Sequence, residues 1–360
     1  MRRPARAGKT RRPLFRLYFL LVVAAGALAG CRKAPLEQCD ATQALCAAYP
    51  FPVGAAINPA ALQPNSDYQR VATRHFNSVT PENIFKPSYL HPEAGQYDWT
   101  QADQLVAFCQ ANQQRLHGHT LIWHQQLPGW MAGFAGSPAD WEAMFRDHIQ
   151  TICRHFRGQV GSWDVVNEAF AADGTLRPTI WSQHLGGSYL EKAFRYAHEA
   201  DPDARLFYND YDLESNPLKR RAVLAWLRTM RQRGVPVHGL GLQMHISIAH
   251  PENTQLAEAL REVQQTGLQL HLSEIDISIN PLRGAVEPTP ELLQRQADKL
   301  AFLVRTYQEL PRAQQFGITF WGISDRDTWL RRYYQRDDYP LLFDDDYQPK
   351  PAFCLLAHPR

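Results

Sequence analysis

The feature that most constrains the fold is a repeated alternation between short β-rich runs and longer amphipathic stretches. Repeated βα units of this kind build a parallel sheet that is covered by helices. Each short run is also short enough to be a single buried strand. The predicted strands are Pro52–Asn58, Phe76–Pro81, Arg115–Trp123, Ser162–Asn167, Arg205–Asn209, Val237–His245, Leu268–Ile277 and Gly317–Ile323.

Three of the intervening stretches carry clear helix signals. Ser137-Pro138 precedes a helix predicted over Ala139 to Phe156, with a polar starter and a proline in the first turn. Asn216-Pro217 begins a second helix, which is predicted to end at Gly234. Thr289-Pro290-Glu291 begins a third helix. Its predicted apolar face consists of Leu292, Leu293, Leu300, Leu303, Val304 and Tyr307.

Eight such units that close on themselves give an α/β fold of the (β/α)8 TIM-barrel type. A doubly wound open sheet has the same periodicity and is the alternative. The barrel is favoured because polar and aromatic residues cluster at the carboxyl ends of the predicted strands, the face where barrel enzymes build their active sites. We therefore predict a single catalytic domain over residues 51–360.

The N-terminal residues resemble an export signal. Residues 1–16 contain seven Lys or Arg and no acid, and an apolar run from Leu17 to Leu28 follows. This run is too short to span a bilayer stably. The ending Leu28-Ala29-Gly30-Cys31 resembles a bacterial lipobox, in which the cysteine becomes the lipidated first residue. The alternative is a plain signal or anchor helix that happens to contain a cysteine.

These features predict an exported bacterial lipoprotein. We expect a signal peptide over residues 1–30, a short tether over 31–50 and a membrane anchor at Cys31. The whole chain carries +2 and the leader +7, so the rest carries about −5 by subtraction. No basic field remains to hold a polyanion, which argues against nucleic-acid binding.

Five cysteines follow Cys31, and in an exported protein some can pair. Cys39 and Cys46 are close enough in sequence to close a small loop. Cys109 and Cys153 fall in apolar helix patterns, which favours buried free thiols. The fifth is Cys354, and because the total is odd at least one cysteine stays unpaired.

Carboxylates, amides, imidazoles and indoles recur at the ends of the predicted strands. A sugar needs such groups, because its hydroxyls pair with polar side chains and its C–H face stacks on aromatic rings. One Trp after a strand is usually a core residue and one Glu there is usually a helix cap, but seven clusters on one face are not explained in this way. The clusters are Glu82-Asn83 with Lys86, His117 to Gln125, Trp163 to Glu168, Tyr208 to Tyr211, Gln243 to His245, Leu272 to Asp276, and Phe320 to Gly322.

Two glutamates in these clusters suit acetal hydrolysis, which needs a proton donor and a negative group facing the oxocarbenium ion. Glu168 and Glu274 end the fourth and seventh predicted strands, on opposite sides of a barrel mouth. Retaining enzymes hold such carboxyl groups about 5–5.5 Å apart. His245 held by Asp276 can keep Glu274 ionised, and that charge keeps Glu168 protonated. Asn167 can offer its amide to a substrate 2-hydroxyl.

Taken in order, these motifs resemble glycoside hydrolase family 10, the endo-β-1,4-xylanases, over roughly residues 50 to 357. An Asn-Glu pair alone occurs in many barrel glycosidases, whereas the complete ordered set is specific. The resemblance implies retaining hydrolysis of internal β-1,4-xylosidic bonds in xylan and xylo-oligosaccharides, with no cofactor and no catalytic metal. We expect a monomer.

The resemblance also implies a role for each matching residue. Glu168 resembles the acid/base and Glu274 the nucleophile, with His245, Asp276 and Asn167 as its supporting residues. The residues that match sugar-binding positions are Glu82, Asn83, Lys86, His119, Trp123, Gln125 and Gln243, together with the leaving-group platform Tyr211 and the aromatic walls Trp321 and Trp329. Such walls exclude a C5 hydroxymethyl group and favour xylose over glucose. One departure is Pro87, where many family members have tryptophan, which affects the shape of a distal sugar subsite.

Two other functions compete with this interpretation. A zinc-dependent barrel hydrolase could use His117, His119, His124 and His245, but the third predicted strand carries two of these and the first carries no matching ligand. A glycan-capture lipoprotein without catalysis would need the aromatic cleft alone. The presence of both glutamates argues against it.

Overall fold

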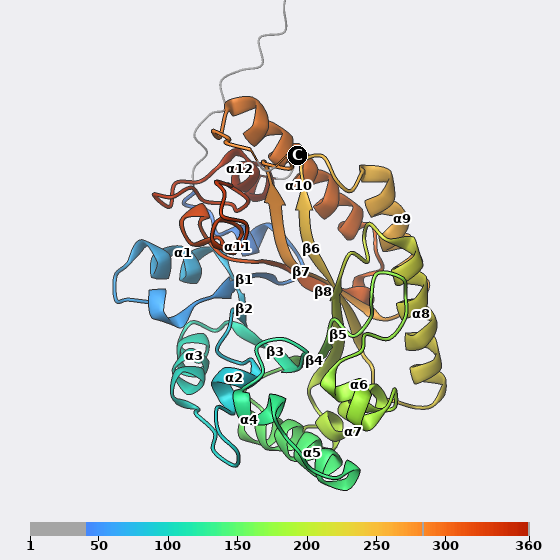
Figure 1. Cartoon of the computed structure of the whole chain (residues 1–360). Helices are drawn as coiled ribbons and strands as arrows, with labels where there is room; N and C mark the ends of the chain where they lie inside the picture. Colours follow the sequence, from blue (N-terminus) through green and yellow to red (C-terminus); the bar gives the residue numbers. More distant parts are fainter. Residues whose placement is uncertain (1–40, 283, 359–360) are drawn as a thin grey trace, which may run out of the picture. The chain divides into compact units, whose positions relative to one another are not determined.

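The structure of the chain, a computed structural model, describes residues 41–282 and 284–358. The predicted signal peptide, the lipidation site Cys31 and Cys39 lie outside these residues. Within them, eight parallel strands close into a barrel in sequence order (Figure 1), so the TIM-barrel prediction is confirmed. The strands are β1 (Val53–Ile57), β2 (Ser78–Pro81), β3 (Arg115–Ile122), β4 (Ser162–Asn167), β5 (Arg205–Tyr211), β6 (Gly239–Ser247), β7 (Gln269–Ser278) and β8 (Gln315–Phe320).

Helices connect successive strands and cover the outside of the barrel (Figure 1). The helices are α1 (Asp67–His75), α2 (Pro87–Leu90), α3 (Thr100–Ala111), α4 (Gly129–Ala132), α5 (Pro138–His155), α6 (Ile180–Leu185), α7 (Tyr189–Ala200), α8 (Pro217–Gln232), α9 (Asn253–Gln264), α10 (Pro290–Gln308), α11 (Trp329–Tyr334) and α12 (Pro351–Ala357). None of the helices in the described ranges is long and apolar enough to cross a membrane.

The helix-start signals read from the sequence are confirmed. The Ser137 side chain caps α5 and forms a reciprocal capping box with Asp140. Asn216 caps α8 and Thr289 caps α10, and each is followed by a proline in the first turn. On the predicted apolar face of α10 the first turn differs, because Leu292 and Leu293 are only half-buried there and the core contact begins a turn later.

The barrel wall separates an apolar outer layer from a polar interior. Along β6, Leu240, Leu242 and Met244 are fully buried against the helices. The alternate positions carry Gly241, Gln243 and His245, because successive side chains of a strand point to opposite faces. The same strands therefore point polar side chains into the barrel and bury apolar side chains on their outer faces.

The bonding state of the cysteines agrees only in part with the predictions from the sequence. Cys109 and Cys153 are buried free thiols, as predicted, and burial raises the pKa of Cys109 to about 12. Cys46 is also free, which contradicts the proposed small loop between Cys39 and Cys46. The physical reason is that Cys46 lies in a short 3-10 helix, Leu45–Ala48, where it packs against the hydrophobic core. Cys354 is disulfide-bonded.

Close packing of β3 on β4 requires a glycine at position 118. A Cβ atom there would lie 2.1 Å from the indole of Trp163, which is fully buried. We predict that Gly118→Ala lowers the free energy of unfolding by about 1–3 kcal/mol, measured by urea denaturation, because overpacking forces the ring or the strand to shift.

The matched control is Gly129→Ala, at the start of α4, where an added Cβ meets no atom within 4 Å. Its stability should stay within about 0.5 kcal/mol of the parent protein. Equal stability of the two variants would show that the Trp163 ring is not fixed against β3.

Candidate active site

The two predicted catalytic glutamates lie at points where the strand backbone departs from regular geometry. Glu168 follows β4 with φ of 57°, and Glu274 lies within β7 with φ of 56°. A left-handed conformation is uncommon for residues other than glycine and is characteristic of functional sites. The register of β7 against β8 shifts between Leu272 and Ile275, around Glu274. These irregularities aim both carboxyl groups into the barrel mouth, where they are only 7% and 5% exposed.

Three side chains surround Glu274 and stabilise its ionised form. The Asn209 amide donates to one carboxylate oxygen at 2.7 Å, and His245 Nε2 lies 3.0 Å from the other. The opposite nitrogen of His245 lies 2.8 Å from Asp276. Burial alone lowers the pKa of His245, but Asp276 and Glu274 raise it well above the usual value. Burial likewise raises the pKa of Glu274, but hydrogen bonds from His245 and Asn209, with the nearby His119, lower it below its ordinary value.

Glu168 has the opposite environment. Its carboxyl group accepts weaker hydrogen bonds from the amides of Asn167 and Gln243, each at 3.3 Å. Burial raises the pKa of Glu168 and the charge of Glu274 raises it further, while Trp123 and Gln243 oppose this only in part. The site therefore holds one carboxyl group that favours its proton beside one that favours the ionised state.

A network of amides joins the two glutamates. The Asn167 side-chain oxygen accepts from Asn209 and from Gln243, both at 3.0 Å, so Asn167 supports Glu274 through Asn209. Asn209 also accepts a hydrogen bond from Ser273 at 2.6 Å. Its side chain lies over Gly241, where an added Cβ would come within 2.2 Å of the amide oxygen. The sequence analysis did not assign a role to Asn209, although its place at the end of β5 was a usable signal.

A second polar group lies beside the glutamates and contains three residues predicted to bind sugars. The Asn83 amide donates to Glu82 at 3.1 Å, and Lys86 donates to Asn83 at 2.9 Å. The Lys86 ammonium group lies 5.0 Å from the Trp123 ring centre and 5.8 Å from that of Trp321. Burial lowers the pKa of Lys86, while the negative charges of Glu274, Glu82 and Glu168 oppose that shift. Lys86 is thus close both to the two predicted catalytic glutamates and to the rings of Trp123 and Trp321.

Aromatic rings enclose the site on the side of β8. The Trp329 indole N–H donates to Asp276 at 2.8 Å, and its ring lies 5.1 Å from that of His245. Trp321 packs edge-on against His119 at 5.4 Å. His119 is fixed in turn by Asp164, 2.9 Å from its Nδ1. The predicted walls therefore contact the residues that hold Glu274.

Tyr211 is linked to Glu168 through Arg177, which donates to both residues. Its hydroxyl accepts a hydrogen bond from Arg177 at 2.8 Å, and the Lys219 ammonium group lies 3.8 Å from its ring centre. Arg177 comes from the loop after β4, and no local sequence pattern indicated its role.

The structure does not connect Gln125, which was predicted to bind sugars, to this site. Among the described residues, the hydrogen bonds of the site do not extend to Gln125, which is exposed and lies 3.5 Å from the His124 ring.

The histidines considered for the alternative zinc site do not form a common coordination group. His117 and His119 both contact Asp164, at 3.1 and 2.9 Å, whereas His245 lies between Asp276 and Glu274. Within residues 41–282 and 284–358, no three His, Cys, Asp or Glu side chains are arranged to hold a metal ion.

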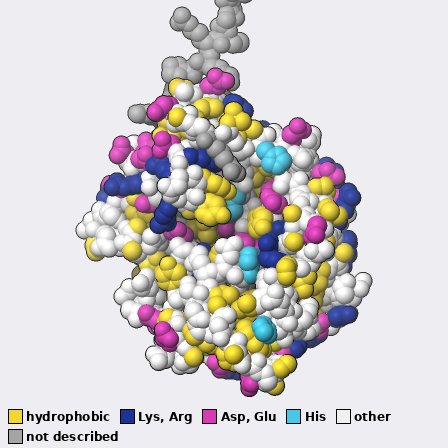
Figure 2. Space-filling model, viewed as in Figure 1, with side chains coloured by type: hydrophobic (Ala, Val, Ile, Leu, Met, Phe, Trp, Pro, Cys, Tyr) yellow, Lys and Arg dark blue, Asp and Glu magenta, His cyan; other side chains and the backbone are white. Residues whose placement is uncertain are grey.

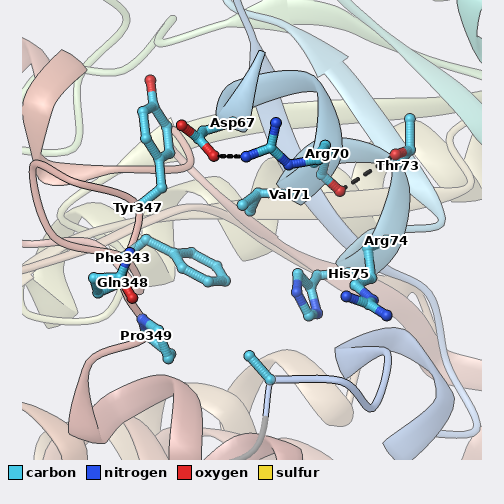
Figure 3. A pocket seen from close by; sticks show the side chains of 11 residues that line it. Asp67, Arg70, Val71, Thr73, Arg74, His75, Phe343, Tyr347, Gln348 and Pro349 are labelled. Carbon is cyan, nitrogen blue, oxygen red and sulfur yellow. Dashed lines mark hydrogen bonds and ion pairs between the residues drawn. The ribbon is translucent and has the colours of Figure 1, made fainter. Parts of the chain in front are cut away.

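On the face shown in Figure 2, histidine, acidic and basic side chains lie among hydrophobic ones near the middle. A separate pocket lies between α1 and the segment around residues 343–349 (Figure 3). Its lining includes Arg70, His75 and Tyr347 but neither Glu168 nor Glu274. At the barrel mouth, by contrast, the pKa of one carboxyl group is raised and that of the other is lowered, which is the pairing that acetal hydrolysis requires.

Comparison with known proteins agrees with this geometry. Residues 41–359 match the sequence model of glycosyl hydrolase family 10. A β-1,4-xylanase from Dictyoglomus thermophilum is 39% identical over 320 residues, which cover 85% of this chain and 88% of that protein. The structure of a GH10 protein from Paenibacillus barcinonensis is 34% identical, with a TM-score of 0.83 and coverage of 86% of this chain and 94% of the other.

Xylanase 10B from Thermotoga petrophila, whose structure was solved in complex with xylobiose, is 35% identical with a TM-score of 0.81. The match covers 89% of this chain and 96% of the other. From the family match over nearly the whole described chain and from these relatives, the chain belongs to glycosyl hydrolase family 10.

Proposed function

We propose that this chain is a retaining endo-1,4-β-xylanase in which Glu168 is the acid/base and Glu274 the nucleophile. The observation that carries the proposal is the opposite electrostatic environment of two buried carboxyl groups in one site. Relatives named as xylanases and a related structure with bound xylobiose support xylan as the substrate.

The proposed reaction follows from the lowered pKa of Glu274 and the raised pKa of Glu168. Ionised Glu274 attacks the anomeric carbon while Glu168 transfers its proton to the departing glycosidic oxygen, which gives a sugar ester on Glu274 and a free chain end. Glu168 is then a carboxylate and removes a proton from water, which attacks the same carbon and releases Glu274. Two inversions give net retention at the anomeric carbon.

The side chains around the two glutamates are of the kinds that bind sugars. Lys86, Asn83 and Glu82 form a chain of donors and acceptors suited to sugar hydroxyls. Trp329 and Trp321 contact His245 and His119 around the nucleophile and act as walls for the reacting sugar. Such walls leave little room for a C5 substituent, which favours xylose over glucose.

The role of Glu168 can be tested by varying the leaving group. For Glu168→Ala we expect xylan cleavage to fall on the order of 10²–10⁴-fold, because the leaving oxygen is no longer protonated. Formation of the sugar ester from an aryl xylobioside with a dinitrophenolate leaving group needs no acid and should be largely retained, measured as kcat/KM. Equal losses on both substrates would remove Glu168 from this role.

The pH profile reports how Glu274 is held. Its pKa is lowered in part by His245, so activity should persist below the usual titration range of a carboxyl group. In His245→Asn this contribution is lost and the pKa of Glu274 rises, so the acid limb of the kcat/KM profile should move to higher pH. The alkaline limb, which follows loss of the Glu168 proton, should move less. An acid limb that does not shift would contradict the role given to His245.

We also propose that the protein is exported and anchored to a membrane through a lipid on Cys31. The basic head, the short apolar run and the lipobox-like ending of the leader support this. When the full chain is expressed in a bacterial host, we expect the protein in the membrane fraction and Cys31→Ser outside it. A membrane-bound Cys31→Ser variant would instead indicate an uncleaved anchor helix.

A further inference from the structure

The peptide bond that follows Glu168 is held from both sides by side chains outside β4. Its carbonyl oxygen accepts a hydrogen bond from Arg177 Nε at 3.1 Å. Its N–H, which belongs to Ala169, donates to the Tyr208 hydroxyl at 2.9 Å. Because β4 ends at Asn167 and Glu168 has left-handed geometry, these groups have left the strand ladder and depend on side-chain partners. The direction of the Glu168 side chain depends on this peptide.

The Tyr208 hydroxyl is oriented by a buried carboxylate. It donates to Asp210 at 2.5 Å, and both residues are completely buried between β5 and the helices. A hydroxyl has one hydrogen and two lone pairs. With its hydrogen committed to Asp210, it can offer only a lone pair to the Ala169 N–H. Tyr208 and Asp210 are two residues apart in one strand and so share its outer face.

An ion pair fixes Asp210. The Lys219 ammonium group of α8 donates to Asp210 at 2.6 Å and to the Tyr211 carbonyl at 2.9 Å, with both ion-pair side chains at most 1% exposed. The Tyr211 hydroxyl accepts from Arg177, which also holds the Glu168 carbonyl. The contacts thus close a ring that links the acid/base to the platform on the leaving-group side.

We propose that Tyr208, oriented by the Asp210–Lys219 ion pair, is a positioning residue that aims Glu168 at the leaving-group oxygen. It acts through the backbone and touches neither substrate nor reacting atoms. The inference rests on the proposed function of Glu168. It predicts a defect confined to steps in which Glu168 moves a proton, which a general loss of stability would not produce.

The test compares kcat/KM of the wild type and Tyr208→Phe on two substrates. Xylohexaose has a poor leaving group, and we expect a fall of about tenfold or more, because a misaligned acid loses part of the 10²–10⁴-fold contribution of general acid catalysis. Dinitrophenyl xylobioside needs no acid in its first step and should change less than about twofold. Equal falls on both substrates, or an unchanged rate on xylohexaose in the folded variant, would overturn the proposal.

Tyr307 provides a matched control. It is also completely buried, and its hydroxyl likewise accepts a backbone N–H, from Gly317, and donates to a buried oxygen, the Leu270 carbonyl. Tyr307→Phe removes the same kind of hydroxyl at a place unconnected with Glu168. Its effect should be the same on both substrates, whatever its effect on thermal stability.

A double variant, Asp210→Asn with Lys219→Met, keeps the test decisive if Tyr208→Phe does not fold. It removes both charges and keeps the Tyr208 hydroxyl, so we expect a smaller fall in kcat/KM with the same dependence on the leaving group. Equal loss on the two substrates would contradict the proposal here as well.

The wild type and Glu168→Ala distinguish a failure of the proposed function from a failure of the proposal for Tyr208. If wild type does not cleave xylohexaose, or Glu168→Ala lacks the leaving-group dependence, the proposed function fails. If both behave as expected and Tyr208→Phe does not, only this inference fails.

Discussion

Two carboxyl groups buried in one site cannot both be ionised at low cost, and the position of His245 determines which of them carries the charge. Its ring lies between Asp276 and Glu274, and these neighbours raise its pKa and so favour the cationic form. His245 and the Asn209 amide favour ionisation of Glu274, while burial and the charge of Glu274 raise the pKa of Glu168 and are opposed only in part by Trp123 and Gln243. The division of labour between acid and nucleophile follows from this asymmetry.

The barrel makes this asymmetry possible because it turns one face of each strand toward the site and the other toward the helices. Inward residues of β4, β5, β6 and β7 form one amide and carboxylate network, while outward residues of the same strands are buried against helices. Space for the network comes from missing side chains. Gly241 leaves room for Asn209 in this network, while Gly118 leaves room for Trp163, a hydrophobic core residue outside it. The outer face also contributes to the chemistry, since Tyr208 and Asp210 reach the Glu168–Ala169 peptide from behind the strand.

Much of this arrangement could be predicted from the sequence because its signals are local. All eight strands are present, within three residues of their predicted bounds, because short β-rich runs between capped helices are a local pattern. The family resemblance supplied the two glutamates and His245 with Asp276, whose contacts the structure provides. Local periodicity was misleading at Leu292 and Leu293, where helix packing determines burial. Closeness in sequence was misleading at Cys46, which is free and packs against the hydrophobic core.

What the sequence could not supply are contacts between distant segments and departures from regular backbone. Arg177 lies in a loop without a motif, yet it holds the carbonyl of Glu168. Glu168 and Glu274 have left-handed geometry on strands whose register against a neighbouring strand shifts, and no single segment encodes such a shift.

The central claim is tested most directly by trapping the sugar ester. The enzyme is incubated with a 2-fluoro xylobioside that carries a dinitrophenolate leaving group, since the fluorine slows the release step, and the labelled peptide is sequenced by mass spectrometry. The account predicts one equivalent of sugar on the side chain of Glu274. A label on Glu168 or elsewhere, or turnover without any covalent adduct, would contradict it.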